Sequence, residues 1–102
     1  MHAALQIQYQ QPEQAMSLLD ALLELNADNW EAKRLLAVAC LQTERYTRSI
    51  MLCEELLQVA PKDHEPGLWF CLSQARWKQN NQDGARQAHR RYLQSLNSES
   101  NE

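Results

Sequence analysis

The chain has 102 residues, of which 44% are hydrophobic and 23% are charged, and its formal net charge is −3. These values are typical of one small soluble domain; they exclude a disordered tail and argue against bulk nucleic-acid binding. Leu occurs 16 times and Ala 12 times, whereas Val and Ile together occur only 4 times. Because β-branched residues favour strands and Leu and Ala favour helices, the composition predicts an all-α protein.

The first pair of predicted helices covers the start of the chain. Residues 3–10 form a weak, largely polar candidate. Apolar residues then recur at helical spacing from Ala15 to Leu23, and Pro12 suits a first helical position, where its missing N–H costs nothing. The pair is expected to close near Asn26-Ala27.

The second pair is more regular. Ala32, Leu36 and Cys40 share one helical face, and a second face runs from Tyr46 to Leu57. Asp28 and Glu31 have the spacing of a capping box before the first of these helices.

The third pair occupies the last part of the chain. One helical face runs from Trp69 to Trp77 and another from Ala85 to Leu96. Pro66 suits a first helical position, Asn80-Asn81 separates the two helices, and Gly84 falls in the first turn of the second.

The pairs repeat with the tetratricopeptide period. Asn26-Ala27-Asp28 has its equivalent 34 positions later at Ala60-Pro61-Lys62. We therefore predict three tetratricopeptide-like helix hairpins, at about residues 1–29, 30–63 and 66–99, that form a short right-handed solenoid. Residues 1–96 are expected to form a single domain and residues 97–102 a polar tail. Small residues are expected where helices approach closely, at Ala37, Ser49, Ser73 and Ala85.

No catalytic, metal-binding or cofactor-binding motif is recognisable. Cys40, Cys53 and Cys71 lack any paired ligand spacing, and there is no glycine-rich phosphate loop. We interpret Cys40 and Cys53 as small core residues and His89 as a packed core histidine. The sequence thus predicts no enzyme, no metal and no cofactor. Its odd cysteine count, with no visible signal peptide or membrane span, favours the reducing cytoplasm.

The predicted binding site is a concave groove formed by the first helix of each pair. Apolar residues that the repeat does not need for its core are Leu41, Phe70 and Trp77, which together predict an exposed patch with a basic and amide rim. Such a groove suits an amphipathic helix. The expected groove residues are Ile7, with Ala4 and Gln8, from the first repeat, then Arg34, Val38, Leu41, Gln42, Phe70, Gln74, Trp77 and Lys78.

Other interpretations of this surface stay open. A neighbouring helix or a dimer could cover Phe70 and Trp77. A co-chaperone that grips an acidic C-terminal peptide is disfavoured, because the positions for its carboxylate clamp carry Val38, Gly67 and Cys71, and only Arg34 is suitable.

Residues 66–96 carry five basic groups against Asp83 alone, on an otherwise acidic chain. These basic side chains are expected to be solvated or to meet an acidic partner surface, and nucleic-acid binding is the weaker alternative. The five are Arg76, Lys78, Arg86, Arg90 and Arg91.

Two strings carry a resemblance to a known family: SLLDALLELNADN at residues 17–29 and WFCLSQARWKQNNQDGARQAHRRYLQSLNSES at residues 69–100. They resemble the YscY-type chaperones of bacterial type III secretion, and the similarity runs from about residue 3 to 100. The resemblance implies a cytoplasmic chaperone that binds a dedicated small export protein of the YscX type. It also implies that the pair engages the cytosolic domain of the export-gate protein, on which secretion of early substrates such as the needle subunit depends, with no insertion into the membrane. A generic tetratricopeptide interaction module that binds another helical or peptide partner is the alternative.

Overall fold

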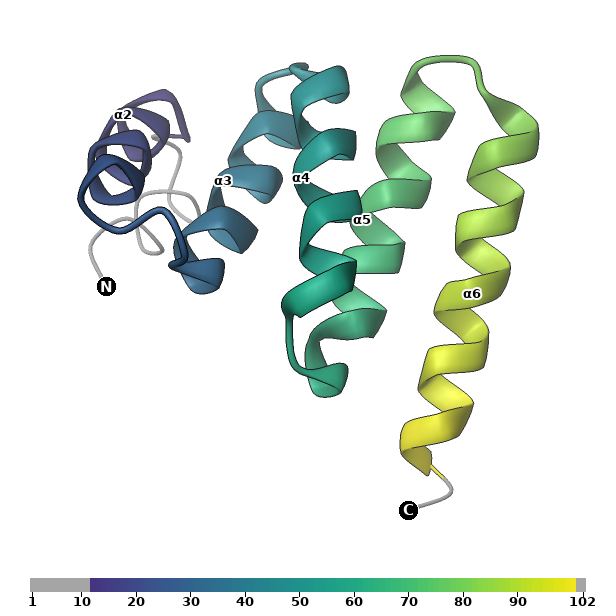
Figure 1. Ribbon diagram of the computed structural model, residues 1–102. Helices are drawn as coiled ribbons and strands as arrows, with labels where there is room; N and C mark the ends of the chain where they lie inside the picture. The colour runs from purple at the N-terminus through teal and green to yellow at the C-terminus, as the bar shows by residue number, and fades with distance from the viewer. Residues whose placement is uncertain (1–11, 101–102) are drawn as a thin grey trace.

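The computed structural model describes residues 12–100, which form five α-helices and one short 3-10 turn (Figure 1). No strand occurs among these residues, so the all-α prediction is confirmed for them. The weak helix predicted at residues 3–10 lies outside the described residues. The elements are α2 (Pro12–Leu25), α3 (Trp30–Gln42), α4 (Tyr46–Val59), η1 (Lys62–His64), α5 (Glu65–Lys78) and α6 (Gln82–Ser100).

Polar side chains and proline mark the helix starts. Pro12 opens α2 as predicted, whereas the predicted capping box is replaced by a single side-chain cap one residue later, with alanine at the third helical position. Asn29, not Asp28, is the N-cap residue, and its side chain accepts a bond from the Ala32 N–H at 3.1 Å. Asn81 acts likewise before α6, where its side chain accepts from the Gly84 N–H at 3.0 Å.

The two hairpins α3–α4 and α5–α6 turn through the same backbone motif. Glu44 and Asn80 both adopt a left-handed conformation with φ of 63°. The residue after each donates its N–H to the last turn of the preceding helix, from Arg45 to Cys40 at 2.8 Å and from Asn81 to Arg76 at 2.9 Å. This is the Schellman arrangement, which satisfies carbonyls at a helix end and reverses the chain within three residues.

Small residues lie where the helices approach one another, as the sequence predicted. Ala37, Ser49, Ser73 and Ala85 are all buried. The Ser49 hydroxyl donates to the Ala37 carbonyl at 2.9 Å, which joins α4 to α3 and satisfies a fully buried polar group.

Two apolar clusters form the core. The first joins α2 to α3 around Met16, Leu19 and Leu36, and the second joins α3 to α6 around Leu56, Leu68 and Leu72. Cys40 and Cys53 belong to these clusters and are fully buried, which confirms their interpretation as core residues.

The helices form a short row with α6 at one end (Figure 1). α3 contacts α5 directly, while α4 packs against both. The exposed sides of α3 and α5 point away from α4. Together with the adjoining edge of α6, we call this surface the inner face. α6 itself continues to Ser100, beyond the domain boundary that the sequence analysis placed at residue 96. No glycine or proline stands between these residues to end the helix.

Candidate functional site

A small hollow lies between α3 and α5 on the inner face. Arg34 and Val38 reach it from α3, and Gly67 and Cys71 from α5. Its volume is about 230 Å³. The Nε atom of Arg34 is buried there without a hydrogen-bond partner in the described part of the chain. We call this the Arg34 hollow; its remaining lining residues are Ala37, Cys53, Asp63, His64 and Leu68.

A larger and more apolar hollow of about 380 Å³ lies between α5 and α6. Trp77, which is 54% exposed, stands on the α5 side, and Leu93, which is 48% exposed, stands on the α6 side. Phe70, 46% exposed, lies nearby with its ring centroid 5.5 Å from that of Tyr92. We call this the Trp77 hollow; it is also lined by Ser73, Gln74, Ala85, Arg86, His89 and Arg90.

The structure places four of the predicted groove residues in these two hollows. Arg34 and Val38 line the first hollow, and Gln74 and Trp77 line the second. Leu41 is half-buried against the second core cluster, so the predicted patch of Leu41, Phe70 and Trp77 is not one exposed surface. Gln42 and Lys78 are exposed but line neither hollow. Ile7, Ala4 and Gln8 lie outside the described residues.

His89 and Leu93 on α6 are residues of the Trp77 hollow that the sequence analysis did not place in the groove. His89 is exposed and lines the Trp77 hollow, so its interpretation as a packed core histidine is wrong. In a longer array the next repeat would cover this side of α6. It is exposed here because no helix follows α6 among the described residues. The signal was present in the spacing, since His89 and Leu93 are one turn apart on the last helix.

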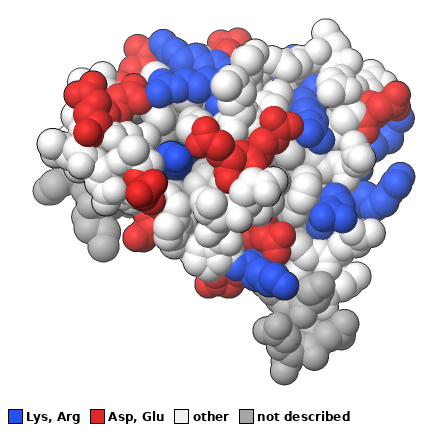
Figure 2. All heavy atoms as spheres, viewed as in Figure 1, with Lys and Arg blue, Asp and Glu red and all other residues white. Residues whose placement is uncertain are grey.

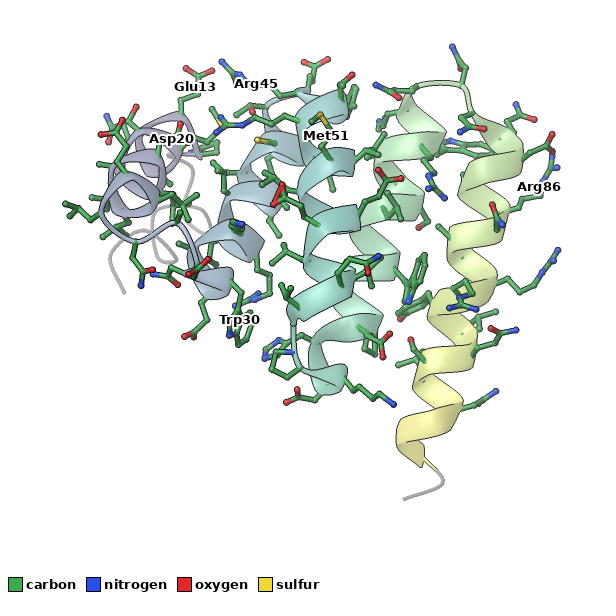
Figure 3. The ribbon with its side chains drawn as sticks, viewed as in Figure 1. Glu13, Asp20, Trp30, Arg45, Met51 and Arg86 are labelled. Atoms are coloured by element: carbon green, nitrogen blue, oxygen red, sulfur yellow. The ribbon has the colours of Figure 1, made fainter. Side chains whose placement is uncertain are left out.

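Basic side chains gather over the last helix. In the view of Figure 2 they lie over α6 at the right, whereas basic and acidic side chains are mixed over the α2–α4 part. Two of the basic side chains are paired: Arg76 with Glu54 at 3.2 Å and Arg86 with Asp83 at 3.1 Å. Figure 3 shows Arg86 pointing outward from α6.

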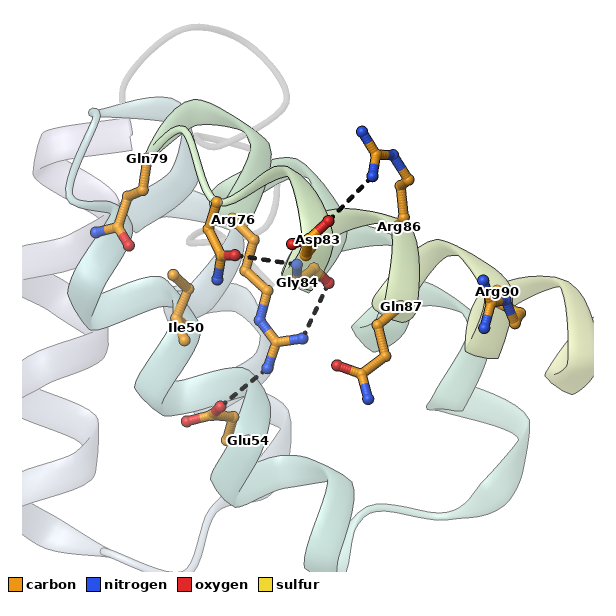
Figure 4. A pocket seen from close by; sticks show the side chains of 10 residues that line it. Ile50, Glu54, Arg76, Gln79, Asp83, Gly84, Arg86, Gln87 and Arg90 are labelled. Atoms are coloured by element: carbon orange, nitrogen blue, oxygen red, sulfur yellow. Dashed lines mark hydrogen bonds and ion pairs between the residues drawn. The ribbon is translucent and has the colours of Figure 1, made fainter.

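Arg76 also closes a polar hollow of about 670 Å³ on the α4 side of the α5–α6 turn (Figure 4). Its guanidinium donates to the Gly84 carbonyl at 3.1 Å as well as to Glu54. The group therefore ties α4, α5 and α6 together, and we assign Arg76 a structural role.

The three cysteines lie in the interior, and the hydrogen bond with Cys53 lowers the pKa of the Cys71 thiol to about 7. All three are free and buried, and no group of three potential metal ligands occurs among the described residues. A hydrogen bond with Cys71, together with burial, raises the pKa of the Cys53 thiol, and burial raises the pKa of Cys40. Both therefore behave as neutral core thiols.

No helix in the described part of the chain is long and apolar enough to cross a membrane. A tetratricopeptide-repeat family model matches residues 6–66, in agreement with the predicted repeats. The chain is also 36% identical over 90 residues to chaperone protein YscY of Yersinia enterocolitica and to that of Yersinia pestis. Each alignment covers 88% of this chain and 77% of the relative.

Proposed function

The chain belongs to the YscY family of tetratricopeptide-repeat chaperones, and on that premise we propose that it serves type III secretion by binding a small YscX-type export protein along its inner face. The bound pair then engages the cytosolic domain of the export-gate protein in the cytoplasm and supports secretion of early substrates such as the needle subunit. The role is one of protein interaction and needs no catalytic group.

The observation that carries this proposal is the Trp77 hollow. Its apolar side chains are exposed on a face that no other described helix covers, and contiguous apolar surface of this kind marks a protein partner site. Trp and Phe contribute most when a partner buries them, so Trp77 and Phe70 are expected to be the main anchors. An amphipathic helix of the export protein fits such a groove.

The co-chaperone alternative has little support. The positions of a carboxylate clamp do come together, because Arg34, Val38, Gly67 and Cys71 all line the Arg34 hollow. Only one of the four is basic, however, and Asp63 lines the same hollow. A C-terminal peptide with two carboxylates would therefore meet a single cation.

Co-expression with the YscX-type partner, followed by size-exclusion chromatography with light scattering, tests the proposal. We predict a stable complex that Trp77→Glu weakens about 10-fold or more, because a carboxylate would be buried in an apolar contact. Met51→Glu is the matched control, since Met51 is 60% exposed on α4 and lines neither hollow (Figure 3). Loss of binding in both variants, or in neither, would contradict a site at the Trp77 hollow.

The gate step needs a separate experiment with the purified cytosolic domain of the export-gate protein. The complex of chain and partner is expected to bind this domain more tightly than the chain alone does. Equal binding by the chain alone would argue against a joint surface, and failure of the complex to bind would contradict the gate step while leaving partner binding intact.

A further inference from the structure

Gly67 occupies a position on α5 where nothing in the described chain requires a glycine. Its φ is not positive, and a Cβ built there would meet no atom within 4 Å. A glycine nevertheless destabilises a helix relative to alanine, by up to about 1 kcal/mol in the interior and by less in the first turn, where Gly67 lies. Gly84 is different, because a Cβ there would run into the Asn81 side chain and approach the Arg76 Cδ to 3.0 Å. The missing side chain at Gly67 thus leaves the α5 backbone open on the inner face.

Arg34 supplies a second, independent observation beside this opening. Its Nε is buried in the hollow without a hydrogen-bond partner, and an unsatisfied buried donor is unfavourable. Asp63 is the carboxylate that lines the same hollow, but it is exposed on η1, and no ion pair joins it to Arg34 in the described residues. The Nε itself is closed to an outside group, but Arg34 is only half-buried, and no hydrogen bond or ion pair from its terminal amino groups occurs within the described residues, so these amino groups have donor capacity for a group from outside the chain.

We propose that the Arg34 hollow receives an aspartate or glutamate side chain from a helix of the export partner, and that Gly67 lets the backbone of this helix approach α5 closely. This inference rests on the proposed function. A guanidinium fork matches a carboxylate in shape and charge, and removal of a Cβ shortens the distance at which two helices can pack.

The position of the hollow relative to Trp77 specifies the partner further. Gly67 and Trp77 are ten residues apart on α5, which corresponds to about 15 Å along a helix axis. A partner helix that follows α5 would therefore carry its acidic residue about three turns from the apolar residue that fills the Trp77 hollow. The chain would thus select a partner helix by the distance between its acidic and its apolar residue, which a purely apolar groove could not do.

Isothermal titration of the purified export partner with variants of the chain tests the proposal. Arg34→Gln and Gly67→Gln are each expected to raise Kd by about 10- to 100-fold, the first by removing a charged hydrogen bond and the second by filling the opening. Gly67→Ala should have a smaller effect. Arg45→Gln is the charge control, because Arg45 is exposed and lines neither hollow. Thermal unfolding of each variant checks that the fold is retained.

The outcomes separate this inference from the proposed function. If Trp77→Glu weakens binding while Arg34→Gln and Gly67→Gln bind within twofold of the wild type, the inference is wrong and the proposed function stands. If the wild-type chain does not bind the partner, both are wrong. A charge exchange then identifies the acidic residue: binding lost in Arg34→Glu should return when one Asp or Glu of the partner is changed to Arg. Failure of every such partner variant would overturn the carboxylate assignment.

Discussion

The hairpins α3–α4 and α5–α6 have the same turn and the same register, yet they bury equivalent positions differently. Cys53 and Leu56 of α4 are fully buried, whereas His89 and Tyr92, 36 positions later on α6, are exposed and half-buried. The difference arises because α5 covers this side of α4, while no described helix covers the same side of α6. In a stacked repeat, burial depends on the neighbouring repeat as much as on the residue itself.

The largest difference in the free energy of unfolding is expected between Leu56→Ala and Tyr92→Ala, which stand at equivalent positions. Leu56→Ala should lower the free energy of unfolding by about 2–5 kcal/mol, because it leaves a cavity between α4 and α5. Tyr92→Ala should lower it by only about 1 kcal/mol, mainly through loss of the ring contact with Phe70. Urea unfolding of the two variants measures both values. Equal losses of stability would contradict the claim that α4 and α6 bury these positions differently.

A smaller effect distinguishes the two glycines of the third repeat. Gly67→Ala should stabilise the fold by up to about 1 kcal/mol, since the added methyl meets open space and favours the helix. Gly84→Ala should destabilise it by up to about 1 kcal/mol, because the methyl displaces the Asn81 side chain from its bond to the Gly84 N–H. Thermal unfolding of both variants gives the signs, and a loss of stability at Gly67 would show that this glycine has a structural role.

The smallest difference in stability is expected between glycine substitutions in the two hairpin turns. Glu44 and Asn80 share the left-handed conformation, which asparagine tolerates better than glutamate. Glu44→Gly should therefore stabilise the fold by several tenths of a kcal/mol up to about 1 kcal/mol, and Asn80→Gly by less. Matched denaturation curves test this order, and a greater gain at Asn80 would contradict it.

Much of the fold follows from short-range patterns that the sequence displays directly. The five described helices match predicted stretches, because apolar residues at helical spacing leave little choice of secondary structure. The cap of α3 was placed one residue early, since Asp28 and Asn29 are both good capping residues and only the turn geometry selects between them.

The candidate site was less predictable than the fold. The repeat frame placed Arg34, Val38, Gln74 and Trp77 on the inner face, where the structure has them lining the two hollows. It could not separate Leu41, which is half-buried against the second core cluster, from the exposed Phe70 and Trp77, because all three are apolar at similar repeat positions. It also assigned His89 to the core, because periodicity identifies a helix face without showing whether another helix covers it.

The sequence by itself determined the helices, their pairing into repeats and the family, since these depend on local periodicity and residue identity. Only the tertiary structure decided which apolar residues stay exposed, that Arg34 has an unpaired buried donor and that Gly67 faces open space. Those properties depend on atoms from other helices, so no pattern within one helix specifies them.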